Sequence, residues 1–315
     1  MSQPDIIVTA PLPPFLYDPL KRDYRCLDYH VAADKAALLK NEGAGIRGLV
    51  QGGGTVTPTS LLDALPQLEI ISVFGVGYDG VPVDYCRKRG VKVSNTPDVL
   101  TDDVADVAVA LIMMTGRGFA RHERFVRSGE WEKRGPDLTM KLAGRHVGIL
   151  GLGRIAKAIA ARVSAMGMQV AYTGRKPQSV AYRFFPDLKS LAADSEFLVV
   201  ACPGGAATRH LVNADVLGAL GKKGTVVNIA RGSIIDEPAL VKALQDGTIK
   251  GAGLDVFADE PHVPAPLLGM DQVVLLPHVG SATHETRKAM GDLCKANLDS
   301  WFAEKKVLTL IPELI

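Results

Sequence analysis

The chain has 315 residues, of which 47% are hydrophobic and 22% charged, an ordinary mixture for a folded globular protein. Lys plus Arg number 36 and Asp plus Glu 34, so no global field favours nucleic acid or an acidic membrane surface, and neither partner is expected. No run approaches the ~20 apolar residues of a membrane helix, and no export signal precedes the first strand pattern. The four cysteines lack the short spacing of paired cysteines. We therefore expect a cytoplasmic protein without a metal site or disulfide framework.

Short apolar runs alternate with helical patterns through the first hundred residues. The strand patterns are Ile6–Ala10, Ile46–Gln51, Glu69–Phe74 and Val91–Ser94, and helical stretches such as Ala32–Lys40 and Val83–Arg89 lie between them. This alternation predicts a parallel, doubly wound sheet. A long helical stretch follows, from about Thr101 to Arg127.

A second alternating series begins after this helix. Its strand patterns are His146–Gly151, Gln169–Thr173, Phe197–Cys202, Thr225–Ala230, Gly253–Phe257 and Val273–Pro277. They are nearly continuous apolar runs, as expected for strands covered by helices on both faces. A last amphipathic helix spans roughly Glu285–Phe302. The chain is therefore predicted to form two doubly wound parallel-sheet α/β domains, Rossmann-like or flavodoxin-like, with a cleft between them.

A glycine-rich turn joins the strand pattern at 147–150 to a helical run. Gly151 permits a tight turn, Gly153 lets the backbone approach a pyrophosphate, and Ala156 stands where a third glycine would allow close helix packing. Amides at the start of the helix favour phosphate binding. Glycines can simply make a turn, but this one lies between a clean strand and a helix, so we predict a dinucleotide cofactor.

The end of the next strand discriminates between NAD and NADP. An acidic residue there would bind the ribose 2′-hydroxyl of NAD, whereas this strand ends at Gly174, followed by Arg175 and Lys176. A guanidinium can grip an anionic 2′-phosphate with its planar fork. Such cations are often only solvated loop residues, but the missing acid favours NADP(H).

Three polar residues stand at or near the ends of three late strand patterns. They are Arg231, Glu260 and His278. Ligands of open α/β sheets bind outside the carboxyl ends of the strands. An Arg can bind a carboxylate bidentately, and a His beside a carboxylate can hold and donate a proton. Each residue alone has an ordinary structural explanation, but together they predict an enzyme that uses a nicotinamide cofactor on an anionic substrate.

Four motifs now point to a known family. Gly-Leu-Gly-Arg-Ile (151–155), Asn-Ile-Ala-Arg-Gly-Ser (228–233), Gly-Leu-Asp-Val-Phe-Ala-Asp-Glu-Pro (253–261) and Pro-His-Val-Gly-Ser-Ala-Thr (277–283) resemble the D-isomer-specific 2-hydroxyacid dehydrogenases. Within that family, the chain looks most similar to NADPH-dependent glyoxylate/hydroxypyruvate reductases. The resemblance implies a substrate-binding domain of residues 1–99 plus 286–315, a dinucleotide-binding Rossmann domain of residues 100–285, and a homodimer.

The resemblance also implies the roles of individual residues. Arg231, Glu260 and His278 match the catalytic residues of the family. Substrate binding is implied for Gly53, Val76, Gly77 and Arg231. Residues predicted to contact the cofactor, from the turn or from the resemblance, are Gly151, Leu152, Gly153, Arg154, Ile155, Gly174, Arg175, Lys176, Cys202, Pro203, Thr208, Ile229, Ala230, Asp255, His278 and Gly280.

Several activities stay open under this resemblance. Reductases of 2-ketogluconate and of hydroxyphenylpyruvate share much of the pattern, whereas formate dehydrogenases carry an amide where this chain has Glu260. A non-enzymatic alternative is an NAD(P)-sensing scaffold like the corepressors that share this fold. Trp131 either lines the pocket of a partner subunit or packs at an interface, and we favour packing.

Overall fold

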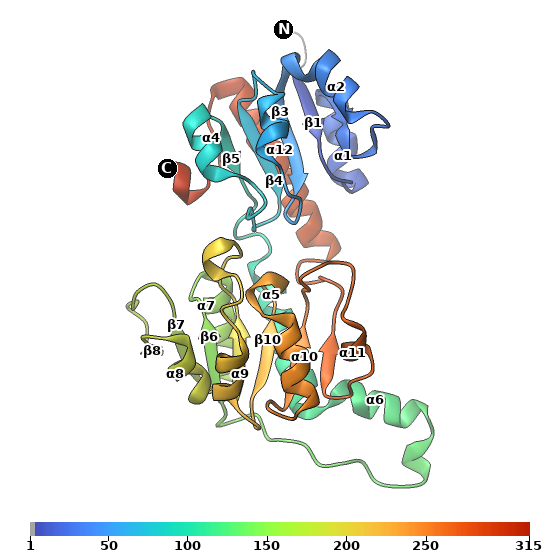
Figure 1. Ribbon diagram of the computed structural model, residues 1–315, viewed down its shortest axis with the longest axis vertical. Coiled ribbons are helices and arrows are strands. Elements are labelled where there is room, and N and C mark those ends of the chain that lie inside the picture. The colour runs from blue at the N-terminus through green and yellow to red at the C-terminus, as the bar shows by residue number, and fades with distance from the viewer. Residues whose placement is uncertain (1–3) are drawn as a thin grey trace. The chain divides into compact units, whose positions relative to one another are not determined.

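The computed structural model describes residues 4–315 and separates them into two compact units. The discontinuous unit comprises the chain up to Leu100 together with Thr283–Ile315, and the central unit is Thr101–Ala282. Each unit contains one sheet in which every neighbouring pair of strands is parallel (Figure 1). The prediction of two doubly wound α/β domains is confirmed.

The discontinuous unit has a five-stranded sheet in the order β2-β1-β3-β4-β5. Its strands are β1 (Asp5–Val8), β2 (Arg25–Asp28), β3 (Ile46–Gly52), β4 (Ile70–Phe74) and β5 (Lys92–Ser94). Its helices are α1 (Pro14–Asp23), α2 (Lys35–Glu42), α3 (Thr59–Asp63), α4 (Val83–Arg89) and α12 (His284–Glu304). Because strand side chains alternate between faces, Ile7, Leu49 and Ile71 share one core with α3 and α4. The other face of β4 is covered by α12.

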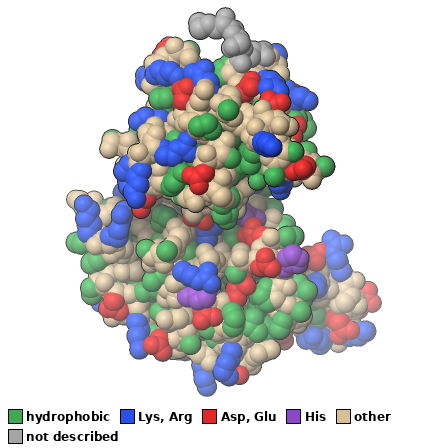
Figure 2. All heavy atoms as spheres, turned by 45° about the horizontal axis from the view of Figure 1, so that its top comes forward, with side chains coloured by type: hydrophobic (Ala, Val, Ile, Leu, Met, Phe, Trp, Pro, Cys, Tyr) green, Lys and Arg blue, Asp and Glu red, His purple; other side chains and the backbone are tan. Residues whose placement is uncertain are grey.

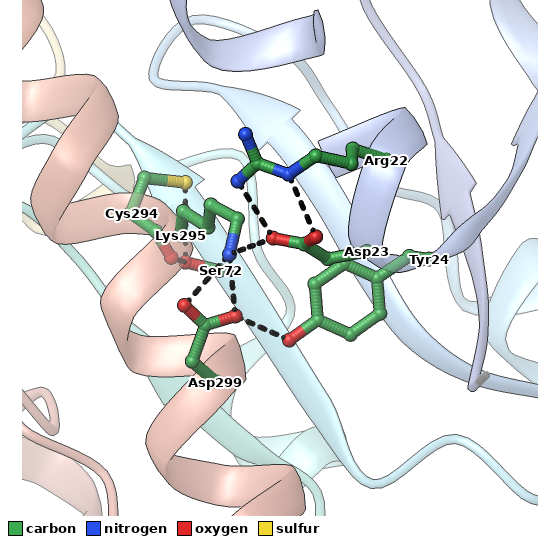
Figure 3. Close-up of polar contacts among 7 residues, drawn as sticks. All are labelled: Arg22, Asp23, Tyr24, Ser72, Cys294, Lys295 and Asp299. Carbon is green, nitrogen blue, oxygen red and sulfur yellow. Dashed lines mark hydrogen bonds and ion pairs between the residues drawn. The ribbon is translucent and has the colours of Figure 1, made fainter. Parts of the chain in front are cut away.

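Polar contacts fix α12 to the rest of this unit (Figure 3). The Tyr24 hydroxyl donates to Asp299 at 2.6 Å, and the Lys295 ammonium pairs with Asp23 at 2.7 Å. The Ser72 hydroxyl on β4 donates to the carbonyl of Cys294 at 2.8 Å. Since Ser72 and Cys294 are buried, this hydrogen bond is shielded from competing water. Residues separated by more than two hundred positions therefore complete one core.

The central unit has a seven-stranded sheet in the order β12-β11-β10-β9-β6-β7-β8. Its strands are β6 (His146–Leu150), β7 (Gln169–Thr173), β8 (Arg183–Phe185), β9 (Phe197–Val200), β10 (Thr225–Asn228), β11 (Gly251–Leu254) and β12 (Val273–Leu275). Its helices are α5 (Thr101–Arg117), α6 (Phe119–Arg127), α7 (Arg154–Ala165), α8 (Leu188–Ala193), α9 (Ala214–Leu220), α10 (Glu237–Gln245) and α11 (Ala265–Leu268). Helices α5 and α7 pack together, and α5 lies on β10 and β11. Side chains of α8, α9 and α10 form a separate core with the sheet.

The strand order reverses between β6 and β9. From β6 the chain adds β7 and β8 on one side, and it then returns to add β9, β10, β11 and β12 on the other. This reversal is a topological switch point, where open α/β sheets place their ligands outside the carboxyl ends of the strands.

The structure corrects the predicted elements in two respects. The helix predicted from Thr101 to Arg127 is two helices, because Gly118 adopts a left-handed conformation with φ 62° and ends α5. Helix α1 and strands β2 and β8 were not predicted. β8 has only three residues and α1 contains Pro19, so neither carries a clear periodic pattern.

Charged side chains of both signs are intermixed on the face of the molecule visible in Figure 2. No helix among residues 4–315 is both long and apolar enough to cross a membrane.

Candidate active site

Three neighbouring strands of the central unit present the predicted catalytic residues at one edge. β10, β11 and β12 are adjacent and parallel, so their carboxyl ends lie together. Arg231 follows the end of β10, Glu260 lies in the loop after β11, and His278 follows β12. The sheet therefore explains how residues far apart in sequence reach one edge.

His278 and Glu260 form a close pair. The Nδ1 atom of His278 lies 2.7 Å from the Oε2 atom of Glu260, so the predicted hydrogen bond between these side chains is confirmed. Because an ionised carboxylate only accepts hydrogen bonds, Nδ1 carries the proton in this pair. The pairing leaves Nε2 as the ring nitrogen that can exchange a proton with a substrate.

The Glu260 carboxylate also accepts a hydrogen bond from the backbone. Its Oε1 atom accepts a hydrogen bond from the amide of Phe257 at 3.0 Å. Burial alone would raise the pKa of this carboxyl. The hydrogen bonds from His278 and Phe257, with the charge of Arg231, outweigh burial and bring the pKa below its ordinary value. Glu260 is thus an ionised acceptor at neutral pH.

A buried asparagine shapes the turn that carries Arg231. Asn228 is only 1% exposed. Its Oδ1 atom accepts a hydrogen bond from the amide of Ala230 at 3.0 Å, and its Nδ2 atom donates one to the carbonyl of Arg231 at 2.9 Å. The Arg231 guanidinium also donates to the carbonyl of Ala230 at 2.8 Å. Sequence reasoning missed Asn228 as a positioning residue, although an amide ending an apolar strand is a signal for it.

Asp255 fixes the loop that follows β12. It is 1% exposed, and its two oxygens accept the amides of Val279 at 2.8 Å and Gly280 at 2.9 Å. Its carbonyl accepts the amide of His278 at 2.8 Å. Burial raises the pKa of this carboxyl against the opposing effect of the two amides. These contacts hold His278 in a left-handed conformation, with φ 54°.

The glycine-rich turn lies at the switch point. Gly151 has φ 89°, and a Cβ atom added there would lie 2.9 Å from the Cα atom of Cys202, so a larger residue does not fit. A Cβ atom added at Gly153 would meet no atom within 4 Å, so this backbone is open to a ligand. Leu152 and Ile229 are buried, which leaves their backbone atoms as the groups available for contact.

The loop after β7 lies beside this turn. The amide of Gly151 donates to the carbonyl of Thr173 at 2.9 Å, and the Gln178 side chain donates to the carbonyl of Leu152 at 3.0 Å. The residues between Thr173 and Gln178 include the predicted group Gly174, Arg175 and Lys176, all exposed. Gln178 was not singled out from the sequence.

The remaining predicted cofactor residues lie on neighbouring segments. Pro203 follows Cys202 after β9, and its carbonyl accepts the Thr208 hydroxyl at 2.8 Å. Arg154 and Ile155 form the first turn of α7, beside the glycine-rich turn. Ala230 is partly buried in the turn after β10.

In the discontinuous unit, the three residues predicted to bind substrate lie close to one another. The amide of Gly53 donates to the carbonyl of Phe74 at 3.1 Å, and a Cβ atom at Gly53 would lie 3.2 Å from the carbonyl oxygen of Gly77. The Asn95 side chain donates to the carbonyl of Val76 at 2.8 Å. The loops after β3 and β4 are therefore in contact.

A surface cavity in the central unit lies away from these residues. Its volume is about 720 Å³, and its lining includes Arg145, His146, Lys222 and Lys223. Since these residues precede or begin β6 and β10, the cavity is at the amino ends of the strands. Among residues 4–315, no group of three or more His, Cys, Asp or Glu side chains is placed to hold a metal ion.

Comparison with known proteins identifies the family. The model of the D-isomer specific 2-hydroxyacid dehydrogenase NAD binding domain matches residues 109–280. The chain is 44% identical over 311 residues to a glyoxylate/hydroxypyruvate reductase A of Arabidopsis thaliana, covering 98% of this chain and 99% of the relative. It is 44% identical over 310 residues to a 2-ketogluconate reductase of Gluconobacter oxydans, covering 98% of both chains.

A solved structure extends the likeness to the fold. The NADPH-dependent glyoxylate/hydroxypyruvate reductase of Sinorhizobium meliloti, in complex with NADP and malonate, is 43% identical, with a TM-score of 0.92. The likeness covers 99% of this chain and 98% of that one. As its motifs predict, the chain belongs to the D-isomer-specific 2-hydroxyacid dehydrogenase family.

Proposed function

We propose that this protein is an NADPH-dependent reductase of small 2-oxo acids, converting glyoxylate and hydroxypyruvate to glycolate and D-glycerate. The observation that carries the proposal is the His278–Glu260 pair, with a 2.7 Å contact, at the sheet edge that also bears Arg231. Relatives named glyoxylate/hydroxypyruvate reductases, similar over nearly the whole chain, support this choice of substrate.

The proposed roles follow from the charge and geometry of the three residues. Arg231 binds the substrate carboxylate, because a guanidinium can form two parallel hydrogen bonds with it. His278 donates the proton from Nε2 to the carbonyl oxygen, since Nδ1 is held by Glu260. Glu260 stabilises the charged imidazolium and orients the ring. Val76 and Gly77 belong to the proposed substrate loop, residues 72–79, in which their amides bind the carboxylate, and Gly53 shapes the other wall of the pocket.

The central unit is the proposed dinucleotide-binding domain and the discontinuous unit the proposed substrate-binding domain. The turn of Gly151 and Gly153 fits a pyrophosphate, because its first glycine excludes a side chain and its second leaves the backbone open. Arg175 and Lys176 would hold the 2′-phosphate, and Gly174 leaves room beside them. When bound, the cofactor supplies the hydride that reduces the carbonyl carbon.

The test is the loss of reduced-cofactor absorbance with NADPH and with NADH. Each cofactor would be paired with glyoxylate, hydroxypyruvate, 2-ketogluconate and hydroxyphenylpyruvate. Fast NADPH-dependent turnover of the two smallest acids is expected. Preference for one of the larger acids would move the assignment to the corresponding reductase. No turnover with any acid would favour the nucleotide-sensing scaffold instead.

We also propose that the protein is a cytoplasmic homodimer. The segment 119–138 of the central unit exposes Phe119, Val126, Trp131 and Leu138, with exposed fractions of 41%, 53%, 63% and 97%. Such a group of apolar side chains on one segment supports a contact with a second copy, in which Trp131 packs at the interface. Light scattering should give the mass of a dimer, and Leu138→Asp should lower it toward a monomer. The four free cysteines support a reducing compartment.

A further inference from the structure

A third carboxylate, after Glu260 and Asp255, lies close to the candidate catalytic residues. Glu237 is the first residue of α10, and its Oε1 atom accepts the amide of Ala258 at 2.7 Å, a contact across 21 positions. The preceding amide, that of Phe257, donates to Glu260 at 3.0 Å. Two consecutive amides of one loop are therefore bound by two different carboxylates, one of which pairs with His278.

The same peptide group is in close contact with the segment of Arg231. A Cβ atom added at Gly232 would lie 1.9 Å from the carbonyl carbon of Phe257 and 2.2 Å from the amide nitrogen of Ala258. Only glycine allows this approach. The peptide between Phe257 and Ala258 is thus confined by Gly232 and by the hydrogen bond to Glu237.

Glu237 is not needed to cap its own helix. The N-cap of α10 is Asp236, whose side chain accepts the amide of Ala239 at 3.2 Å. The carboxylate of Glu237 instead reaches out of the helix to the loop after β11. Its position is electrostatically unfavourable, because burial raises its pKa and the negative charges of Asp259 and Glu260 raise it further. The hydrogen bond from Ala258 opposes this effect.

We propose that Glu237 is a positioning residue, which holds the amide of Ala258 and so keeps the carboxylate of Glu260 on Nδ1 of His278. The expected effect of Glu237 on turnover rests on the proposed function. The positioning role itself is independent, because the contact between Glu260 and His278 can be followed without any substrate.

The test compares three substitutions of Glu237 that separate the effect of side-chain length from the effect of charge. Glu237→Ala removes the acceptor, Glu237→Asp keeps the charge but shortens the side chain by one methylene, and Glu237→Gln keeps the acceptor without the charge. Asp187→Ala is the matched control, because it removes a cap of α8, 2.8 Å from the amide of Ser190, within the same unit. The Asp and Gln variants decide the question if the Ala variant does not fold.

Two readouts are needed. Steady-state kinetics should show kcat reduced about 10- to 100-fold in the Ala and Asp variants, with KM for NADPH nearly unchanged, because misplacement by ~1 Å can cost ~100-fold in rate. The Gln variant and the Asp187→Ala control should retain kcat. In parallel, the Nδ1 proton resonance of His278, identified by its loss in His278→Gln, should broaden in the Ala and Asp variants and persist in the Gln variant.

Each outcome decides one question. Normal kcat and an unchanged His278 resonance in the Asp variant would overturn the positioning role. Equal losses in the Gln and Asp variants would also overturn it, since the acceptor alone would then be insufficient. If the wild-type protein reduces none of the four acids, the proposed function fails, while the resonance still reports whether Glu237 positions Glu260.

Discussion

Replacing Gly232 by Ala should inactivate the enzyme without unfolding it. The added Cβ atom would lie 1.9 Å from the carbonyl carbon of Phe257, and ordinary contact begins at 3.4 Å, so the two segments must separate by about 1.5 Å. Overpacking of this kind typically costs about 1–3 kcal/mol, less than the 5–15 kcal/mol by which most domains are stable. A shift of ~1.5 Å would, however, break the 2.7 Å contact between Glu260 and His278.

The expected loss in kcat is therefore about 100- to 10,000-fold, the range spanned by misplacement and by loss of general acid catalysis. The assay is NADPH oxidation with glyoxylate, with the thermal midpoint measured on the same samples. Gly218→Ala in α9 is the control, because its Cβ atom meets nothing within 4 Å. It should gain about 0.5–1 kcal/mol in stability and keep full activity. Full kcat in Gly232→Ala would refute the reasoning.

Three further predictions follow from the site and the cores. Arg175→Ala should raise KM for NADPH about 10- to 100-fold, because hydrogen bonds to a charged group contribute ~1.5–3 kcal/mol. KM for NADH should stay unchanged, and an equal rise in KM for both cofactors would contradict the 2′-phosphate contact. Because the pKa of Glu260 is lowered, its contribution to stability is present above the ordinary carboxyl value of ~4.3 and is lost as pH falls through the lowered value. The difference in unfolding free energy between wild type and Glu260→Gln, from urea titrations, should therefore shrink in acid, and a difference that grows would exclude this pairing. Burial raises the pKa of Cys202 to about 11 and that of Cys294 to about 12, so neither thiol should react with a disulfide reagent at pH 8 until the protein is unfolded.

The strands that carry the site could be predicted because their signals are local. The apolar runs before Asn228, Asp255 and His278 end at polar residues, and parallel strands bring such ends to one edge. The pairing of His278 with Glu260 follows from the same placement. Helical patterns begin just after both positions at which the two units separate, at about Thr101 and at Glu285, but periodicity does not show that the last helix returns to the first sheet.

Other features depend on contacts that no local pattern encodes. The break at Gly118 is absent from the pattern because the residues on both sides keep helical spacing, and only the left-handed φ of 62° ends α5. The contact of Glu237 with Ala258 depends on how close Gly232 brings two loops, and Gln178 reaches Leu152 across 26 positions. Such residues were missed because their partners are set by tertiary packing and not by spacing.

The return of α12 to the first sheet has a consequence for the order of folding during synthesis. The ribosome releases β1 to β5 first, yet the face of β4 that carries Ser72 lacks the cover of α12 until Cys294 emerges, 222 residues later. By then every strand of Thr101–Ala282 has already been made. The sheet translated first is therefore finished last, and in the interval its apolar surface is a natural substrate for chaperones.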